Sequence, residues 1–594
     1  MTKTETYLPR WDLDSIFPGG SESEQYDTYV KNVTNDLDKL DKLVNKFELK
    51  EGNTKALNDI VTLLEQTTKK VKEASSFVSC LSAQDVKDEG AKQLVGKRSE
   101  LNAKMDAVQT KLDQKLIAID DKEWQKVLEA PGLKEIAFVL NESRDNAKEK
   151  LPAAEEVLLN DLAIDGYHGW SQMYDTIVGN MQVELEEDGK VNKYSVAQAA
   201  NKLTNPDRQV RQHVFTQLQK AWGEQTDLFS QTLNHLAGFR LQTYKHRNWD
   251  NVLKEPLSIN RMSEETLDAM WNAIDNNKHH FVSFLEKKAE ILGLHKLSIY
   301  DVNAPISQSV KKSSYTEGAQ FIIDQFHQFS PKMADFAKMA FEKRWIEAED
   351  RSGKRPGGFC TTFPDSEETR IFMTYSGTTS NITTLAHELG HAYHQHIMND
   401  VNGLNQGYAM NVAETASTFA EMIVADAAVN QATDKEEKKA LLEDKIKRSI
   451  TFFMNIHARF TFEKRFYEER KQGLVSADRL NEIMVEAQKE TYCDALEEYD
   501  PTFWASKLHF HITGVPFYNF PYTFGYLFSL GLYAHAKNQG GSFEDDYIAL
   551  LRDTGSMKVE DLAEKHLGVD LTKPDFWESA IGLCKEDVEE FLSL

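Results

Sequence analysis

Cysteine is scarce in this chain, which has only four in 594 residues. They are Cys80, Cys360, Cys493 and Cys584. No two of them form a CxxC pair, and their wide spacing excludes a disulfide scaffold. The pattern is typical of a protein from a reducing compartment.

Proline and glycine are also few, at 14 and 30 residues, whereas 27% of the chain is charged. This composition indicates helices that are joined by short connections. Alternating strand-like patterns are almost absent. We therefore predict a mainly α-helical fold.

Basic residues are outnumbered, with 69 Lys and Arg against 94 Asp and Glu, which gives a net charge of −25. Because phosphate binding needs a basic surface, this balance excludes nucleic acid as a partner. Residues 1–7 lack the apolar core of a signal peptide, so we expect a cytoplasmic protein. Residues 516–536 are uncharged and long enough to span a bilayer, but their prolines and tyrosines favour a buried cavity wall, and we predict no membrane interaction.

The chain is longer than one compact domain of roughly 100–200 residues, so we expect two packed lobes. Apolar residues between 26 and 49 recur at steps of three and four, which indicates a packed helix, and a similar run follows between 57 and 116. Pro152 and Pro206 predict helix breaks. We place an N-terminal helical lobe at residues 1–200 and a second lobe, which carries the motif below, at residues 201–594.

The most informative motif is His387-Glu388-Leu389-Gly390-His391. Side chains four residues apart lie on one face of a helix, so His387 and His391 can reach a single metal ion. Glu388 then lies beside the metal, where it could deprotonate a water, as in the HExxH motif of zinc peptidases. The alternative is a solvent-exposed helix face with no metal.

A catalytic zinc usually has three protein ligands, so one more is needed. His394 lies about 10 Å along the helix from His387, too far to share the ion, and Ile397 replaces the third histidine of metzincins. A second amphipathic helix is predicted from about Asn411, and on it Glu414 is the expected third ligand. Glu421 would share that face and could orient a ligand imidazole, or could be an ordinary solvated carboxylate.

These residues resemble the thimet oligopeptidase and oligoendopeptidase F family of zinc peptidases. The resemblance rests on the HELGH motif, on Glu414 within VAETAST, on RWDLDSIF at residues 10–17 and on GGFCT at residues 357–361. It covers nearly the whole chain. It implies two helical lobes around a deep substrate channel, one Zn²⁺ per chain, and short peptides as substrates.

Two short runs before the motif, residues 358–363 and 370–375, predict a β-hairpin with a turn at 364–368. An exposed strand edge can hold an extended peptide by main-chain hydrogen bonds. Glycines permit close approach of the backbone. We predict that Gly357, Gly358, Phe359 and Cys360 contact the substrate, with an ordinary structural hairpin as the alternative. This hairpin, beside the zinc helix, is the only β structure that we predict.

Residues 509–526 are rich in histidine and tyrosine, which can donate hydrogen bonds to an oxyanion. By the family resemblance, Tyr522 is the first candidate for this role and His509 the next, with Tyr518 and Tyr526 lining the pocket. The chain has His-Phe-His where the family more often has His-Phe-Tyr, so either His509 or His511 could be the active imidazole. Tyrosines at four-residue spacing could also be core packing.

We predict a zinc-dependent endopeptidase that hydrolyses short oligopeptides, with Glu388 as general base and then proton donor to the leaving amine. One alternative is a zinc carboxypeptidase on a similar fold, in which Arg355 or Arg370 would hold the terminal carboxylate. Another is an inactive peptide-binding protein, but a carboxylate that is not a ligand serves catalysis only. The oligomeric state is not predicted.

Overall fold

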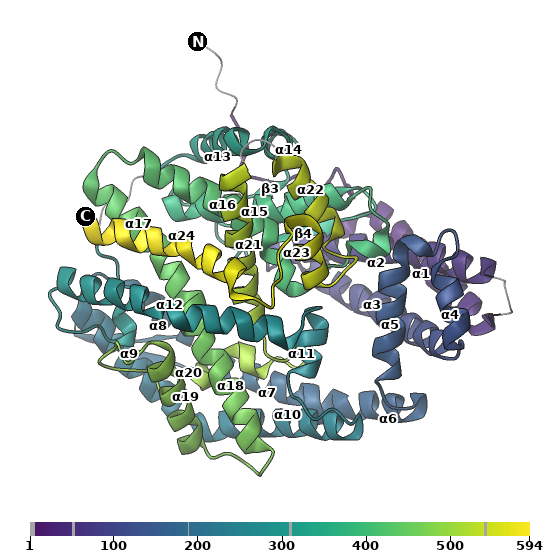
Figure 1. Ribbon diagram of the computed structural model, residues 1–594, viewed down its shortest axis with the longest axis horizontal. Coiled ribbons are helices and arrows are strands. Elements are labelled where there is room, and N and C mark those ends of the chain that lie inside the picture. The colour runs from purple at the N-terminus through teal and green to yellow at the C-terminus, as the bar shows by residue number, and fades with distance from the viewer. Residues whose placement is uncertain (1–5, 50–53, 188, 308–311, 540–542) are drawn as a thin grey trace.

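The structure is a computed structural model, which describes residues 6–49, 54–187, 189–307, 312–539 and 543–594. Within these residues the fold is mainly α-helical with two small sheets, as predicted (Figure 1). No helix of the described part of the chain is long and apolar enough to cross a membrane.

The first five helices gather at the right-hand side of Figure 1. They are α1 (Glu24–Lys46), α2 (Lys55–Gln84), α3 (Glu89–Ile117), α4 (Asp121–Leu128) and α5 (Ala137–Lys148). The predicted apolar stripe of α1 is confirmed, because Val33, Leu37, Leu40 and Val44 are all buried. Two hydrophobic clusters hold this region together, and one of them includes Phe363 and Phe372 of the sheet described below.

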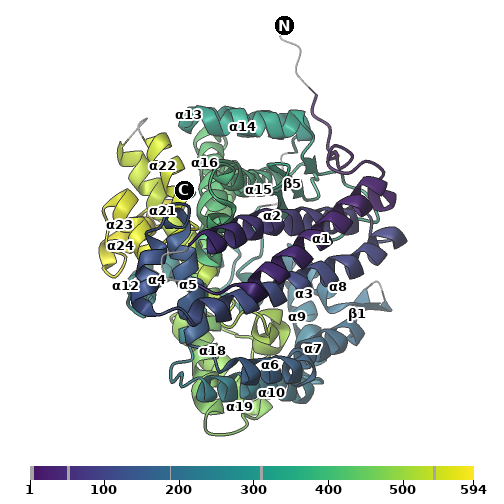
Figure 2. The ribbon, with the colours of Figure 1, turned by 90° about the vertical axis from the view of Figure 1, so that its right-hand side faces the viewer.

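Among the described residues, the next segment forms seven helices, of which α6, α7, α9 and α10 lie in the lower part of Figure 2. The seven helices are α6 (Ala153–Ala163), α7 (Gly169–Asn180), α8 (Val196–Asn201), α9 (Arg208–Gly223), α10 (Thr226–His246), α11 (Lys254–Ile259) and α12 (Glu264–Ile291). A hairpin of β1 (Val183–Glu187) and β2 (Lys190–Tyr194) lies between α7 and α8. The prediction of a single β structure was therefore wrong. Val183 and Leu185 are buried and alternate with exposed glutamates, but over only five residues.

The remaining helices complete both halves. They are α13 (Tyr315–Phe329), α14 (Pro331–Glu342), α15 (Thr379–Met398), α16 (Met410–Gln431), α17 (Lys435–Ile450), α18 (Ile456–Arg470), α19 (Ala477–Thr491), α20 (Phe503–Ser506), α21 (Phe520–Gln539), α22 (Phe543–Asp553), α23 (Val559–Leu567) and α24 (Pro574–Ser593). Most of their buried side chains belong to one large hydrophobic cluster. The uncharged run at residues 516–536 lies mainly in α21, whose packing is described with the site.

The predicted hairpin is present as β4 (Phe359–Phe363) and β5 (Glu368–Phe372), paired antiparallel. A short strand β3 (Ile346–Glu347) adds to β5 in parallel, so the order is β3-β5-β4 and β4 is an edge strand. The sheet packs against α2 and α15. The division into lobes at residues 200 and 201 and the deep channel between them stay predictions.

Candidate metal centre and its surroundings

Helix α15 presents two imidazoles on one face because its other face is buried. Thr378 caps the helix start in a capping box with Asn381. Leu385 and Leu389 are completely buried, which anchors the helix, while His387 and His391 stay half-buried.

Gly390 allows α15 and α16 to approach closely. A Cβ atom at position 390 would lie only 2.4 Å from the carbonyl oxygen of Ala416 and 2.5 Å from the Cα of Ser417. Any larger residue would therefore push the two backbones apart. The glycine inside the HELGH motif thus brings Glu414 within reach of the histidines.

Helix α21 fixes Glu414 from the opposite side. A Cβ atom at Gly525 would lie 2.8 Å from the Cβ of Glu414. The Ser529 hydroxyl donates to the backbone carbonyl oxygen of Glu414 at 2.9 Å, and the Ser417 hydroxyl donates to its carboxylate at 2.7 Å. The side chain is therefore held between three helices.

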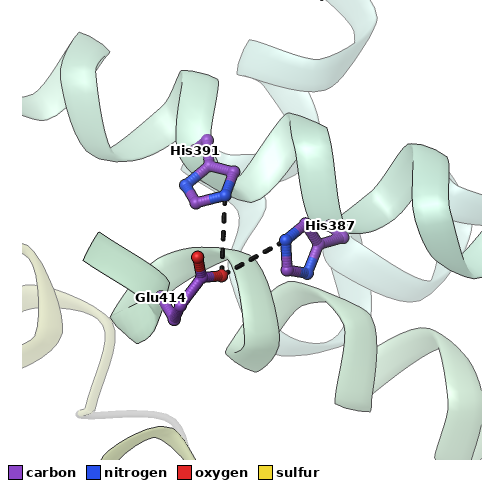
Figure 3. A group of neighbouring side chains, drawn as sticks. All are labelled: His387, His391 and Glu414. Carbon is purple, nitrogen blue, oxygen red and sulfur yellow. Dashed lines mark ion pairs between the residues drawn. The ribbon is translucent and has the colours of Figure 1, made fainter. Parts of the chain in front are cut away.

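His387, His391 and Glu414 point toward one another (Figure 3). The Oε2 atom of Glu414 lies 3.2 Å from Nε2 of His387 and 3.6 Å from Nε2 of His391. One nitrogen or oxygen from each of the three residues falls within 4.8 Å of the others. Two imidazoles and one carboxylate at this separation suit the three-ligand set of a catalytic zinc.

The electrostatics of the cluster favour the forms that bind metals. Burial lowers the pKa of His391 to about 4, so its imidazole is neutral near pH 7. Burial tends to raise the pKa of Glu414, but the two imidazoles and Ser417 outweigh it and lower that pKa to about 2. Metal ligands must be deprotonated, and both groups meet that condition.

Glu388 lies beside this group without belonging to it. Its Oε2 atom is buried and has no hydrogen-bond partner among the described residues. Burial, which is the main cause, and the nearby Glu414 raise its pKa to about 7, against a smaller lowering by His387. A carboxylate with such a pKa can both take up and release a proton near neutral pH.

Glu421, about two helical turns beyond Glu414 on α16, contacts His387 directly. Its Oε2 atom lies 3.1 Å from Nδ1 of His387. Its other oxygen forms an ion pair with Arg448 of α17. Glu421 therefore orients the imidazole so that Nε2 faces Glu414.

The start of the edge strand β4 passes next to Glu388. A Cβ atom at Gly358 would lie 3.5 Å from Oε1 of Glu388 and 3.2 Å from the carbonyl oxygen of Phe372. Gly357 has φ +92° with open space around it. Burial and the Glu388 carboxylate raise the pKa of the Cys360 thiol well above its usual value, so it stays protonated. Phe359 stacks on Phe372 at 5.2 Å.

The structure gathers three of the predicted C-terminal residues. The rings of His509, on the short helix η8 (Leu508–His511), and Tyr518 are 5.5 Å apart, and the rings of Tyr518 and Tyr522 are 5.4 Å apart. Burial, then Tyr518 and Glu414, raise the pKa of Tyr522, so its hydroxyl is a neutral donor near the cluster. Burial lowers the pKa of His509 to about 4, with help from Arg459 and Lys507.

A buried carboxylate fixes the loop that carries Tyr518. Glu463 accepts hydrogen bonds from the backbone N–H of Phe517 at 3.2 Å and from the side chain of Asn519 at 2.7 Å. Phe517 has φ +52°. Tyr518 is thereby held between two anchored residues.

Two predicted residues do not join this group. His511 is completely buried, and its ring stacks on Tyr174 at 4.0 Å. Tyr526 is buried too, and its hydroxyl lies 2.9 Å from that of Ser449. Both side chains pack in the core, so His509 is the imidazole that the structure places with Tyr518 and Tyr522.

Sequence reasoning missed several residues around the centre. Arg448 holds Glu421, and Gly525 and Ser529 position Glu414. Tyr408 is close enough for Glu414 and Cys360 to raise its pKa, after burial. No spacing signal links these positions in the sequence. Only the GxxxS spacing within α21 hints at a close helix contact.

Comparisons with known proteins agree with the geometry. The model of peptidase family M3 matches residues 202–583, and a model described as oligopeptidase F matches residues 115–182. The chromosomal oligoendopeptidase F of Lactococcus lactis subsp. cremoris is 25% identical and aligns over 100% of this chain and 99% of its own. Oligopeptidase PepF of Bacillus subtilis is 22% identical over 98% of this chain and 87% of its own.

Solved structures share the fold. Oligoendopeptidase F from Enterococcus faecium superposes with a TM-score of 0.69 at 18% identity, over 96% of this chain and 98% of its own. A proposed peptidase from Chlamydophila abortus gives a TM-score of 0.82 at 19% identity, over 98% of both chains. At these identities the superpositions establish the fold alone.

Proposed function

The chain belongs to peptidase family M3, and on that basis we propose that it is a zinc-dependent endopeptidase that hydrolyses short oligopeptides. The observation that carries the proposal is the His387, His391 and Glu414 cluster with the unpartnered Glu388 carboxylate beside it. Family membership supports a metallopeptidase that acts on peptides. The metal identity, the roles of the residues and the endopeptidase mode are our proposal.

His387, His391 and Glu414 would hold one Zn²⁺ per chain through Nε2, Nε2 and a carboxylate oxygen. The chemistry that Zn²⁺ supplies in such a site is Lewis-acid activation of water and of the substrate carbonyl. Glu421 keeps His387 in the tautomer whose Nδ1 carries the proton, which leaves Nε2 free to bind.

Glu388 acts as the general base. Its carboxylate takes a proton from the attacking water and then passes that proton to the nitrogen of the leaving amine. Burial strengthens this role, because the raised pKa makes the carboxylate a better proton acceptor. The Cys360 thiol stays protonated and does not compete as a nucleophile.

The edge strand β4 would hold the peptide in an extended conformation. Its only strand neighbour among the described residues is β5, so its other edge can pair with a substrate backbone. Gly358 places that backbone beside Glu388. Tyr522 and His509, which are neutral at pH 7, would donate hydrogen bonds to the oxyanion and the substrate carbonyl, with Tyr518 beside them.

The carboxypeptidase alternative loses one of its two candidate cations. Arg370 is completely buried, donates to the backbone oxygen of Asp12 and forms an ion pair with Glu368 at 2.8 Å. Arg355 is exposed and lies over the Phe359 ring at 4.8 Å. Neither is grouped with the metal cluster.

An internally quenched peptide that is blocked at both ends tests the proposal. We expect the protein to cut it internally, to lose that activity on chelation and to regain it with added Zn²⁺. A carboxypeptidase or an inactive binding protein would leave the blocked peptide intact. Mass spectrometry of the products shows the position of the cut.

A further inference from the structure

Two cationic side chains next to His509 lie in one cavity, and neither forms an ion pair among the described residues. Arg459 of α18 and Lys507, which precedes η8, line a cavity of about 560 Å³. The cavity is lined by residues of α7, α8 and α9, by residues between 299 and 303 and between 450 and 459, by Tyr492 and by residues between 500 and 508. This volume is in the usual range for a ligand pocket.

The two cations flank one aromatic ring. The Arg459 guanidinium lies 5.3 Å from the centre of the Phe503 ring, and the Lys507 ammonium lies 4.7 Å from it. The guanidinium also donates to the Asn455 side chain at 2.8 Å. Neither cation has a carboxylate within 4.0 Å among the residues that the structure describes.

Some buried cations of this acidic chain have close carboxylate partners, whereas Arg240 donates to the hydroxyls of Tyr167 and Tyr467. Lys445 lies 2.6 Å from both Asp426 and Asp587, and Lys288 lies 2.6 Å from Glu443. In the cavity, the acidic residues are Asp175, which is exposed, and Asp500. The Asp500 carboxylate accepts hydrogen bonds from the backbone and hydroxyl of Thr502, at 2.9 and 2.8 Å.

Both cations are half-buried, and their position in one cavity is unfavourable. Burial lowers the pKa of Lys507 to about 8, and Arg459 lowers it further, while Asp500 opposes. Burial also lowers the pKa of Arg459 to about 10. A buried charge without a partner destabilises the fold unless a ligand compensates it. An anionic ligand would offset both the desolvation cost of the two charges and their mutual repulsion.

The cation pair adjoins the proposed catalytic group. Arg459 and Lys507 are close enough to His509 to lower its pKa. Tyr522 is close enough to Arg459 to raise the pKa of the guanidinium. Tyr522 is in turn close enough to Glu414 for that carboxylate to raise the pKa of Tyr522. A peptide held on β4 and crossing the metal cluster could therefore extend past Tyr522 and His509 into the cavity.

We propose that Arg459 and Lys507 form a carboxylate-binding subsite that holds the free C-terminus of a short peptide substrate. This inference rests on the proposed peptidase function. Every linear peptide has this carboxylate whatever its sequence, so the subsite would favour short peptides whose C-terminus can reach the cavity. With the C-terminus held in the cavity, the bond that is cleaved at the metal cluster would lie several residues before that C-terminus.

A set of three matched quenched peptides tests the subsite at pH 7. The first has a free C-terminal carboxylate, the second a C-terminal amide, and the third a free carboxylate with one internal Asp replaced by Asn. We expect the wild-type protein to cut all three internally, with the KM of the amide raised by about 10-fold or more, equivalent to about 1.4 kcal/mol. The internal Asn should leave KM unchanged.

Variants then assign the preference to the two cations. Lys507→Met and Arg459→Gln should each reduce the acid-to-amide ratio of kcat/KM toward one, whereas Lys507→Arg should retain most of it. Lys150→Met removes an exposed lysine from a different cavity, lined by α3, α5 and α6, and serves as the matched control. Because the ratio compares two peptides on one sample, a partly unfolded variant still gives a valid reading.

The outcomes separate the subsite from the function. Equal KM values for acid and amide in the wild type, or an undiminished preference in Lys507→Met and Arg459→Gln, would overturn the subsite alone. If KM rises for the peptide with the internal Asn and stays unchanged for the C-terminal amide, the cations bind an acidic side chain. That result would overturn the C-terminal proposal. No cleavage of any peptide would overturn the proposed function and the subsite together.

Discussion

The two regions that supply the polar side chains of the site are assembled in different ways. On α15 and α16 the functional residues are set by helical spacing, with His387 and His391 four residues apart and Glu414 and Glu421 seven apart. From η8 to the start of α21, residues at similar spacing separate into different environments. His509 joins Tyr518 and Tyr522, whereas His511 and Tyr526 are buried elsewhere.

The difference shows that spacing predicts a site only when the helix and its buried face are both predictable. Leu385 and Leu389 fix which face of α15 is buried, so the faces of the histidines follow. The C-terminal segment is aromatic on all sides, and apolar contacts on every face leave its orientation to the tertiary packing.

Glu388→Gln should have the largest effect on the first region. Gln keeps the shape of the side chain but cannot accept the proton, so we expect kcat to fall by about 10²–10⁴-fold. Zinc content, measured on the same sample by mass spectrometry, should be unchanged because Glu388 is not a ligand. A variant that loses its metal would show that Glu388 has a ligand or structural role instead.

The fold class could be predicted from the sequence because scarce proline and glycine leave long helices uninterrupted. The prediction of the hairpin of β4 and β5 was also correct, because a clear turn separates two apolar runs. The hairpin of β1 and β2 was missed because Val183 and Leu185 are its only buried residues. The contribution of Arg448 depends on how α17 packs beside α16, which no local pattern encodes.

Tyr522→Phe and Tyr526→Phe sharpen the comparison within one helix. If Tyr522 donates to the oxyanion, its loss should lower kcat by about 10²-fold with little change in thermal stability. Tyr526→Phe removes the buried contact with Ser449, so it should lower the melting temperature and leave kcat near that of the wild type. Equal kcat values for the two variants would show that Tyr522 contributes to packing and not to catalysis.

His509→Ala and His511→Ala make the same test on neighbouring imidazoles. His509→Ala should lower kcat/KM by about 10-fold, as expected for the loss of one hydrogen bond to a developing charge. His511→Ala opens a cavity against Tyr174 and should cost about 2 kcal/mol or more of unfolding free energy. Kinetics and denaturant unfolding on both variants check this, and a reversed pattern would make His511 the active imidazole.

Glu421→Gln is the smallest change expected in the first region. It weakens the acceptor for Nδ1 of His387 and leaves the Arg448 charge without its carboxylate, so metal affinity should fall by about 10-fold. Competition with a fluorescent chelator measures this affinity. The control is Glu436→Gln, which changes an exposed residue of α17. Equal metal affinities in the two variants would make Glu421 a structural residue only.

The most direct measurement of the central claim is the zinc content of the wild-type protein and of Glu414→Ala after dialysis against a weak chelator. A metal ion held by His387, His391 and Glu414 predicts one zinc per wild-type chain and a clear loss in the variant, with both proteins folded by circular dichroism. Wild-type protein without stoichiometric metal, or a variant that retains all of it, would contradict the account.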